Sequence, residues 1–530
     1  MPESLIIGTR GSELALWQAR RIQSLLSEKG ISARLEIIKT QGDQIQNLPL
    51  SKLEGKGFFT RELEEALLDG RIDLAVHSMK DLPTDLPAGL KLVAVPERES
   101  PADRFLIHRD AADPSQPFGF RTGARVGTSS NRRIDQLRYH RPDAQAVPIR
   151  GNVPTRVQKL RDGVVDVLIM AAAGLNRLDL DLNDLIVVEP DLTVWVPAPA
   201  QGALAIECRD PDDRIQGILA DLNSAAISTL VSVEREFLKL TGGGCHAAVG
   251  ALAMPTGRRM VLQTFFENRY LAVGGEDPGQ VPARALALHQ KLNEPSAETV
   301  WLVRNHEDVA DLTRLLEPSG RVIWQQPAIR IRYEDRKNLI MRATRDADES
   351  DLILFTSHNA VFWTATRLPV FIRERQVLAI GPATARAARD AGFENVLLSS
   401  VGNTRGLVTE WELLPLKDVK KVFYPVSAMG DTDWIQAEPM KGIEFRKSVV
   451  YWPEALELPD PLPVTPDVMV VYSASAVPVL SPVIKAMTHP IRLVSIGPKT
   501  TAALREQEIR VDYEALYPSV DEILTGILGS

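Results

Sequence analysis

The sequence predicts an α/β protein with several domains. In the first half short apolar stretches alternate with longer amphipathic ones: Leu5–Ile7 precedes a helix through Ala15–Leu26, and Asp73–Val76 and Val164–Met170 are further strand-like stretches. Such alternation is typical of strands that pack under helices. The chain has 530 residues, 44% of them apolar and 25% charged. At roughly 150 residues per domain, about three to five domains are expected.

Proline-rich breaks suggest where these domains begin and end. Breaks around Pro96–Pro101 and Pro190–Pro199 enclose a segment that we interpret as a domain inserted into another domain. The chain would then cross between the two domains twice, and the two crossing segments would form a hinge. A smaller unit follows Asp221, and the main boundary is expected near Pro295. We therefore expect five domains, at residues 1–100 with 197–220, 101–196, 221–295, 296–333 with 453–530, and 334–452.

A loose internal repeat marks the second half. The pair LILFTSHNAV and VLAIGPATARAARDAG is followed by the similar pair VMVVYSASAV and LVSIGPKTTAALREQ. Such doubling predicts two similar α/β units. Each IGPxT motif would place glycine and threonine at a helix start, where free N–H groups are available.

Composition excludes several classes of protein. The formal net charge is −8, which argues against nucleic-acid binding and leaves room for local basic pockets only. Cys208 and Cys245 are the two cysteines, and they form neither a CxxC motif nor a Cys/His cluster, so neither a disulfide framework nor a zinc site is expected. With no signal peptide and no long apolar run, we expect a cytoplasmic protein without membrane contact, acting as a monomer.

Four expected strand-to-helix junctions share the same chemistry. In an open α/β sheet, ligands bind beyond the carboxyl ends of the strands. Arg132, Arg133 and Arg156 would lie in first helical turns, where a cation is unfavourable unless an anion lies nearby. The hydroxyls of Ser12, Thr128, Ser129 and Ser130 could cap helices or donate to a carboxylate. Repetition favours a pocket for a polycarboxylate, and the junctions are GTRGS, HSMKD, GTSSNRR and RGNVPTR.

Two further side chains could carry chemistry. Asp81 is a carboxylate beside Lys80; such a pair is often a surface ion pair, but among cations it would stay ionised and could stabilise a developing positive charge. Cys245 follows three glycines, which leaves either an accessible thiol or a buried free cysteine. Cys208 lies on an expected strand, where packing is its expected role.

The first half resembles porphobilinogen deaminase, also called hydroxymethylbilane synthase, over about residues 5–252. The matching segments are GTRGSELALWQA, EGKGFF, LAVHSMKDLPTDLPAGL, VGTSSNRRIDQL, IRGNVPTRVQKL, MAAAGLNRLDL, PAPAQGALAIECR and GGGCHAAVGA. The resemblance implies two hinged lobes like those of periplasmic binding proteins and a small α+β domain. It also implies a dipyrromethane cofactor bound covalently to Cys245, from which four porphobilinogens are joined with loss of ammonia.

The same resemblance implies roles for individual residues. Asp81 matches the catalytic aspartate that stabilises cationic pyrroles. The residues that match carboxylate-holding positions for cofactor and substrate are Arg10, Ser12, Lys80, Thr128, Ser129, Arg132, Arg133, Arg150, Gly151 and Arg156. Two positions depart from the family pattern: Ala200 replaces a glycine, which could stiffen the hinge, and His246 follows the cysteine.

The second half resembles uroporphyrinogen-III synthase, a two-lobed α/β family, over about residues 298–528. The matches are FTSHNAV, AIGPATARAARDAG, NTRGL, SVVYW, VYSASAV and SIGPKTTAAL, whereas LVRNHED departs from the pattern. The resemblance implies that Ser357, Ser473 and Thr500 contact carboxylates and that Tyr451 assists loss of a hydroxyl group. A core aromatic at a strand end is the alternative for Tyr451.

Together the resemblances imply a bifunctional enzyme whose partners are porphobilinogen and hydroxymethylbilane. The expected product is uroporphyrinogen III, formed with inversion of the last ring. Two other interpretations stay open at this stage. The second half could be a non-catalytic domain that only binds hydroxymethylbilane, or the chain could be a cytosolic carboxylate-binding protein.

Overall fold

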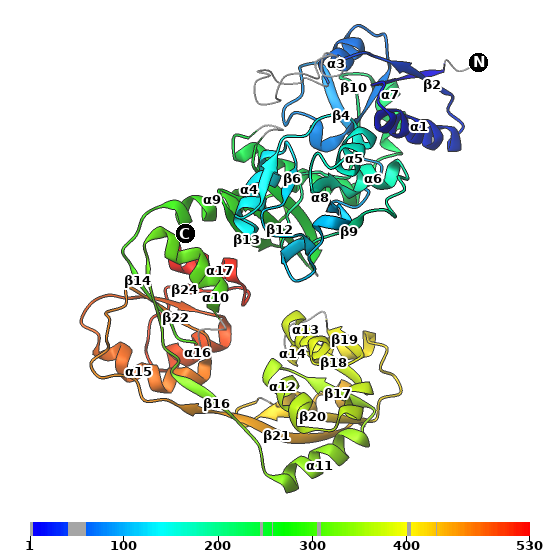
Figure 1. Cartoon of the computed structure of the whole chain (residues 1–530). Helices are drawn as coiled ribbons and strands as arrows, with labels where there is room; N and C mark the ends of the chain where they lie inside the picture. Colours follow the sequence, from blue (N-terminus) through cyan, green and yellow to red (C-terminus); the bar gives the residue numbers. More distant parts are fainter. Residues whose placement is uncertain are drawn as a thin grey trace. The chain divides into compact units, whose positions relative to one another are not determined.

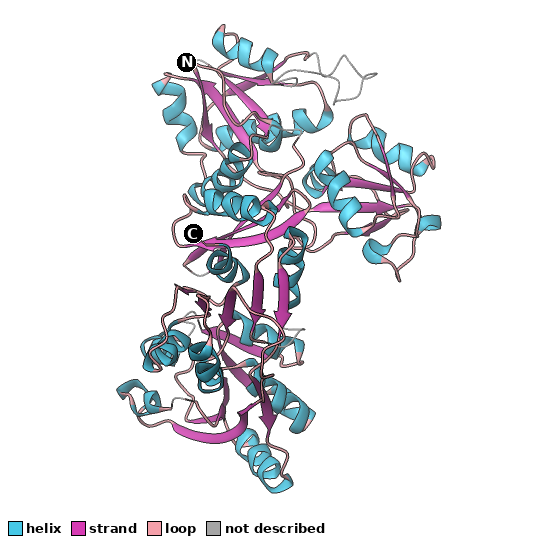
Figure 2. Ribbon diagram, turned by 90° about the vertical axis from the view of Figure 1, so that its left-hand side faces the viewer, coloured by secondary structure: helices cyan, strands magenta, loops and turns pink. Residues whose placement is uncertain are grey.

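The computed structural model describes residues 4–40, 60–243, 247–256, 258–304, 309–399, 404–430 and 432–529. The chain divides into two compact units, Met1–Pro295 and Ser296–Ser530. Strands and helices alternate through both units, as the α/β pattern predicts (Figure 1 and Figure 2). Among the described residues, no helix is both long and apolar enough to cross a bilayer.

The first sheet of unit 1 has the strand order β2-β1-β3-β10-β4. Strand β1 is parallel to β2 and β3, whereas β10 is antiparallel to β3 and β4. The strands are β1 (Leu5–Thr9), β2 (Ala33–Ile37), β3 (Leu74–Ser78), β4 (Leu90–Ala94) and β10 (Leu204–Arg209), and the associated helices are α1 (Glu13–Glu28), α3 (Arg61–Leu68) and α7 (Asp213–Ala220).

The second sheet of unit 1 has the order β7-β6-β8-β5-β9. Here β6 is parallel to β7 and β8, and β5 is antiparallel to β8 and β9. The strands are β5 (Asp103–Ile107), β6 (Arg125–Gly127), β7 (Gln145–Val147), β8 (Val167–Ala171) and β9 (Ile186–Val188), and the helices are α4 (Asn131–His140), α5 (Val153–Arg161) and α6 (Ala172–Arg177). All strands of this sheet fall between the two proline-rich breaks.

The third part of unit 1 is a small antiparallel sheet with two helices. Its strand order is β11-β12-β13. The elements are α8 (Ala225–Leu240), β11 (Gly250–Thr256), β12 (Arg259–Phe266), β13 (Arg269–Gly275) and α9 (Val281–Asn293).

The two chain crossings between the first two sheets lie directly against each other. The Glu99 amide donates to the carbonyl of Gly202 at 3.0 Å, and the Leu204 amide donates to the carbonyl of Glu97 at 3.1 Å. Gly202 has a φ of 87°, and a Cβ there would lie 2.2 Å from the Glu99 carbonyl oxygen. Only glycine therefore allows this close approach of the two backbones.

A buried carboxylate on α8 holds both crossings to the third part of the unit. Glu234 accepts two hydrogen bonds from the Arg98 guanidinium, at 2.8 and 3.0 Å. It also accepts from the Ala200 amide at 2.7 Å and from the Ala253 amide of β11 at 2.9 Å. Ala200 has a left-handed φ of 59°, which costs more for alanine than for glycine. The hydrogen bond to Glu234 holds that backbone in place.

Unit 2 contains two sheets. The first has the order β15-β14-β22-β23-β24, and the second has the order β16-β21-β20-β17-β18-β19. The first comprises β14 (Thr299–Leu302), β15 (Val322–Gln325), β22 (Val468–Val471), β23 (Arg492–Ser495) and β24 (Tyr513–Glu514), with α10 (Ala310–Leu316), α15 (Val477–Ala486), α16 (Pro498–Glu506) and α17 (Val520–Leu528). The second comprises β16 (Ile329–Tyr333), β17 (Leu352–Phe355), β18 (Gln376–Ile380), β19 (Asn395–Ser399), β20 (Lys421–Ser427) and β21 (Glu444–Ala455), with α11 (Lys337–Asp348), α12 (His358–Arg367), α13 (Pro382–Asp390) and α14 (Thr404–Glu410).

The internal repeat corresponds to two similar arrangements of strands and helices. In one, β17, α12, β18 and α13 follow one another, and in the other β22, α15, β23 and α16 do so. The two strands of each set pair in parallel. Gly381 and Gly497 are the N-caps of α13 and α16, the positions that the IGPxT motifs predict.

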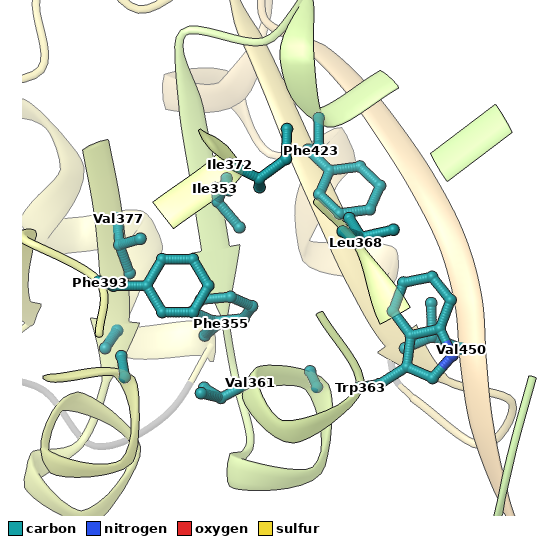
Figure 3. Packing of buried hydrophobic residues seen from close by; sticks show 14 of the residues in the cluster. Ile353, Phe355, Val361, Trp363, Leu368, Ile372, Val377, Phe393, Phe423 and Val450 are labelled. Atoms are coloured by element: carbon teal, nitrogen blue, oxygen red, sulfur yellow. The ribbon is translucent and has the colours of Figure 1, made fainter. Parts of the chain in front are cut away.

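Aromatic and aliphatic side chains fill the core of the second sheet of unit 2. Phe355 and Phe423 come from neighbouring strands, and Trp363 of α12 packs beside Val450 of β21 (Figure 3). The Trp363 indole N–H donates to the carbonyl of Glu334 at 2.7 Å, which satisfies its buried polar atom. This packing fixes α12 against β21, the two elements that carry Ser357 and Tyr451.

Strand β16 extends the second sheet beyond the boundary expected from the sequence. That boundary was placed after residue 333, with 296–333 assigned to the first lobe. Residues Ile329–Tyr333 instead pair antiparallel with the end of β21, from Ala455 to Tyr451. Strand β16 and the end of β21 are the two chain segments that connect the sheets of unit 2. Because they pair with each other, residues Ile329–Tyr333 belong to the second sheet.

Replacing Glu234 by alanine should destabilise unit 1 strongly. The change leaves the Arg98 guanidinium buried without its carboxylate, which costs roughly 3–5 kcal/mol. Lys239→Ala is the matched control on the same helix, because it removes only the exposed ion pair with Asp85 at 2.8 Å. Chemical unfolding should show a much larger loss for Glu234→Ala. Equal losses in the two variants would contradict this account.

Candidate active site

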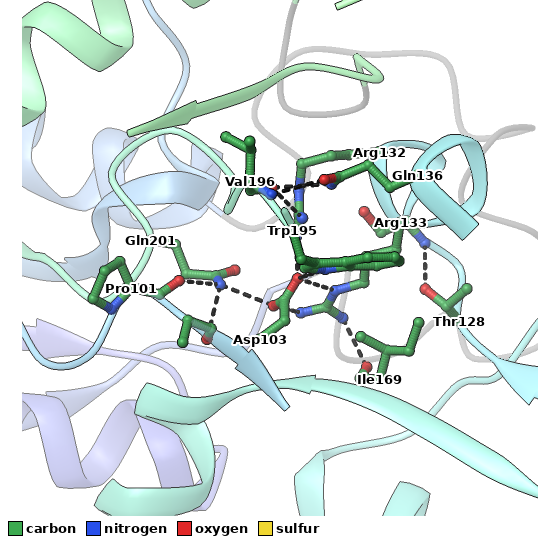
Figure 4. Close-up of polar contacts among 12 residues, drawn as sticks. Pro101, Asp103, Thr128, Arg132, Arg133, Gln136, Ile169, Trp195, Val196 and Gln201 are labelled. Atoms are coloured by element: carbon green, nitrogen blue, oxygen red, sulfur yellow. Dashed lines mark hydrogen bonds and ion pairs between the residues drawn. The ribbon is translucent and has the colours of Figure 1, made fainter. Parts of the chain in front are cut away.

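A buried carboxylate organises the arginines at the start of α4. Asp103 Oδ2 lies 2.8 Å from Arg132 Nη2, and Asp103 Oδ1 lies 2.6 Å from Arg133 Nη2. The indole N–H of Trp195 and the amide of Gln201 also donate to Asp103, each at 2.9 Å (Figure 4). The Asp103 carboxylate therefore accepts hydrogen bonds both from α4 and from the second crossing, the segment between β9 and β10.

This network supplies the anion that the sequence indicated beside the arginines. Burial alone would raise the pKa of Asp103, but Arg132 and Arg133 outweigh burial and hold that pKa well below its usual range. The anion beside these two helix-terminal arginines is therefore a protein carboxylate, whereas the sequence pattern predicted an anionic ligand. One protein carboxylate balances two guanidinium groups, so a net positive charge is left.

More cations gather next to this network. Burial, then Arg133 and Arg132, lower the pKa of Lys80 to about 8, although Asp81 and Asp103 act in the opposite direction. Burial, then Arg133 and Arg150, lower the pKa of Arg156 to about 10. The Lys80 ammonium donates to Gln201 Oε1 at 3.3 Å. Lys80 from the first sheet thus lies near the arginines of the second.

Arg150 has an unsatisfied donor in this cluster. Its Nη2 is buried and has no hydrogen-bond partner among the described residues. A buried guanidinium nitrogen without an acceptor costs free energy that a ligand carboxylate would recover. The cluster of Lys80, Arg133, Arg150 and Arg156, which we call the cationic cluster, is therefore suited to a polyanion.

Asp81 lies within reach of the cationic cluster. It is the last residue of the 3₁₀ turn η2 (Met79–Asp81), directly after β3, and it is exposed. Its charge acts on Lys80 from the same turn and on Arg156 from α5. The structure therefore brings together the aspartate and basic residues that three separate motifs contributed.

The small and hydroxylated site residues mainly shape these junctions. Ser12 caps α1 by accepting from the Ala15 amide at 3.3 Å, and Thr128 Oγ1 accepts from the Ser130 amide at 3.3 Å. Ser129 Oγ donates to the carbonyl of Ile149 at 2.9 Å and so ties its junction to the one before Arg150.

Gly151 and Arg10 complete the set in the first unit. Gly151 has a φ of 117°, and a Cβ there would lie 2.8 Å from the side chain of Thr155. Its carbonyl accepts from Arg156 Nε at 2.8 Å, which orients that guanidinium. Arg10 is half-buried directly after β1.

The two cysteines differ in what the structure describes. Cys245 and its neighbour His246 lie outside the described residues. Cys208 is buried on β10, and burial raises the pKa of its thiol to about 11. This confirms the expectation that Cys208 packs in the core, because a thiol in that environment is a poor nucleophile.

Arg177 is a basic residue that the sequence reasoning missed. It is buried at the end of α6, donates to the carbonyl of Gly202 at 2.6 Å and lies 5.4 Å from the ring of Trp17. Nothing in the spacing of residues in the motif MAAAGLNRLDL marks its single arginine as part of a site. Only the fold shows that it joins α1, α6 and the second crossing.

In unit 2 the second sheet brings two of the expected residues together. Ser357 is the N-cap of α12, and its Oγ lies 2.9 Å from Tyr451 Oη. Ser473 and Thr500 lie with the first sheet, Ser473 as the N-cap of the 3₁₀ turn η11 (Ala474–Ala476) and Thr500 in the first turn of α16. Thr500 is 3% exposed, so its side chain offers little surface to a ligand.

Comparison with protein families matches both units. The model for the porphobilinogen deaminase, dipyromethane cofactor binding domain matches residues 5–217, and the model for uroporphyrinogen-III synthase HemD matches residues 310–525. Neither match favours a carboxylate-binding protein or a merely binding second half.

Individual relatives agree with these matches. The chain is 46% identical over 269 residues to the porphobilinogen deaminase of Trichlorobacter lovleyi, which covers 50% of this chain and 84% of that protein. It is 48% identical over 256 residues to the porphobilinogen deaminase of Nitratidesulfovibrio vulgaris, which covers 48% of this chain and 79% of that protein. The crystal structure of uroporphyrinogen-III synthetase from Helicobacter pylori is 20% identical, with a TM-score of 0.32, covering 44% of this chain and 99% of that one.

The chain therefore belongs to the porphobilinogen deaminase family through its first unit, carries a uroporphyrinogen-III synthase domain in its second, and is a bifunctional enzyme of tetrapyrrole biosynthesis.

Proposed function

We propose that unit 1 joins four porphobilinogens to hydroxymethylbilane at the cationic cluster, and that unit 2 closes this product to uroporphyrinogen III. The observation that supports the proposal for unit 1 is the surplus of basic groups around Asp81, together with a buried donor of Arg150 that is left for a ligand. Porphobilinogen carries one acetate and one propionate, so every ring added brings two carboxylates. A growing chain of such rings matches a site with several separate cations.

The cofactor of this family is a dipyrromethane, and we propose Cys245 as its covalent anchor. When bound, it supplies the pyrrole carbon to which the first substrate is joined. Its carboxylates fit the basic and hydroxyl groups described above, because these groups come from both sheets and face few protein carboxylates. The residues that we propose to hold cofactor and substrate carboxylates are Arg10, Ser12, Lys80, Thr128, Ser129, Arg132, Arg133, Arg150, Gly151 and Arg156.

Asp81 is the proposed catalytic residue of unit 1. Loss of ammonia from porphobilinogen leaves a positive charge on the pyrrole, and a fixed carboxylate stabilises that charge as it develops. The charge of Asp81 interacts with those of the neighbouring Lys80 and Arg156. The same cations hold the substrate carboxylates away from Asp81, so its negative charge stays available for the reacting ring.

In unit 2 we propose Tyr451 as the group that assists loss of the hydroxyl from hydroxymethylbilane. Ser473 and Thr500 are the proposed carboxylate contacts from the first sheet, and Ser357 of the second sheet lies beside Tyr451. Enforcing a bent pose of the linear molecule favours closure with inversion of the last ring. We also propose that the chain acts as a monomer in the cytoplasm.

Replacing Asp81 by asparagine should lower turnover of porphobilinogen by about 100-fold or more, because it removes a charge that acts in the transition state. The variant should still carry the cofactor, which intact mass reports, with Cys245→Ala as the reference that lacks the added mass. Asp85→Asn is the matched control, since Asp85 lies in the same proline-rich segment and pairs with Lys239 at the surface. Normal turnover in Asp81→Asn would rule out the proposed role.

The two activities should separate at the boundary near Pro295. A fragment of residues 1–295 should consume porphobilinogen but release hydroxymethylbilane, which closes unaided to the type I isomer, whereas the full chain should yield type III. Chromatography of the oxidised uroporphyrins distinguishes the two isomers. If the full chain gave only type I, unit 2 would not be an active synthase.

A further inference from the structure

Ser357 and Tyr451 form a hydroxyl pair in which either oxygen can be the donor, and the neighbours of the pair bear on its direction. Ser357 Oγ accepts from the Ala360 amide at 3.2 Å, as the cap of α12. It lies 2.9 Å from Tyr451 Oη. A serine hydroxyl has a single proton to donate, and the helix amide already occupies one of its acceptor sites. Donation to Tyr451 uses that proton and leaves the serine one further acceptor site.

We infer that Ser357 is a positioning residue that donates to Tyr451 and thereby directs the Tyr451 proton toward the ligand. The inference rests on the proposed synthase function of unit 2. It replaces the role implied by the family resemblance, in which Ser357 contacts a carboxylate. The Ala360 amide takes one acceptor site of the Ser357 oxygen and Tyr451 takes its proton. The acceptor site that is left cannot bind an ionised carboxylate, because a carboxylate only accepts hydrogen bonds.

A second tyrosine on the adjacent strand shows the opposite arrangement. Tyr333 on β16 lies directly opposite Tyr451 on β21. Its hydroxyl donates to Asn359 Oδ1 at 2.9 Å, an amide oxygen that can only accept. The two rings are 6.4 Å apart and both pack against the same core. The Tyr333 proton is therefore donated to Asn359 of α12, whereas the Tyr451 proton is available to a ligand when Ser357 is the donor of their pair.

A hydrogen bond donated by Ser357 to Tyr451 suits the first step of ring closure, which is loss of the hydroxyl group. The bond between the hydroxymethyl carbon and its oxygen breaks, the electron pair stays on oxygen, and the Tyr451 proton converts the leaving hydroxyl into water. The positive charge is left on the pyrrole of the substrate. The O–H of Ser357 stabilises the phenolate that forms, because hydrogen bonds to an ionised acceptor are stronger than those to a neutral one. The proton released when the ring closes returns to Tyr451.

The test compares Ser357→Ala, Tyr451→Phe and the double variant in the full chain, with Tyr333→Phe as the matched control. Ser357→Ala should lower kcat for hydroxymethylbilane closure about tenfold, the equivalent of one charge-assisted hydrogen bond, with KM nearly unchanged. The type I fraction should rise accordingly. In the Tyr451→Phe background the serine change should add nothing, and Tyr333→Phe should behave like the wild type.

Two further measurements distinguish a variant that is misfolded from one that has lost only its synthase activity. Ser357→Thr keeps both the cap and the hydroxyl, so it should restore the rate, and ammonia release by unit 1 should be normal in every variant. Additive losses in the double variant, or a rise in KM alone for Ser357→Ala, would overturn the inference in favour of direct carboxylate contact. A wild-type chain that produced only type I would instead refute the proposed synthase function, before any variant is compared.

Discussion

The carboxylate of Asp103 is the constraint on which the deaminase site depends. Two guanidinium groups, an indole N–H and the Gln201 amide converge on it in the protein interior. Without it, Arg132 and Arg133 would be two adjacent buried cations at the positive end of α4, which is an unfavourable arrangement. The hydrogen bonds to Asp103 fix the positions of α4, β5 and the second crossing relative to one another. The remaining cations then surround a site in which ligand carboxylates complete the charge balance.

Gln201 and Glu234 extend this order into the hinge. Gln201 donates to Asp103 and accepts from Lys80, so the two sheets of unit 1 meet at one side chain. Glu234 binds both crossings, through Arg98 and Ala200, and binds β11 through the Ala253 amide. Helix α8 and strand β11 flank the segment that contains Cys245, the proposed anchor of the cofactor, and Glu234 connects both elements to the hinge. Such connected polar networks hold a defined geometry when every member is satisfied.

The sequence predicted the α/β class, the internal repeat and the burial of Cys208, because alternation and apolar runs report on strand burial. It could not predict that Asp103 would pair with both arginines, since Asp103 and Arg132 are distant in sequence and no spacing rule joins them. Arg177 and Gln201 were missed for the same reason: their partners are backbone carbonyls and side chains that only the fold brings near. The boundary at residue 333 was misplaced because β16 continues its ladder across the lobe junction. In unit 2 the motifs identified Ser357 and Tyr451 separately, whereas their mutual hydrogen bond is a property of the packing of α12 on β21.

The central claim is that protein carboxylates leave the cationic cluster short of negative charge until ligand carboxylates arrive. The pKa of Lys80, which burial lowers most and which Arg133 and Arg132 lower further, responds to carboxylates added beside it, and it can be followed by NMR titration of isotopically labelled lysine with Lys80→Arg for assignment. In protein produced without porphobilinogen, so that no cofactor is attached, the account predicts a pKa of about 8 rather than the ordinary 10.5. Assembly of the cofactor should raise it, because a nearby carboxylate favours the protonated ammonium, and protons should be taken up on binding at pH values above 8. An ordinary pKa in the cofactor-free protein, or no change on assembly, would contradict the account.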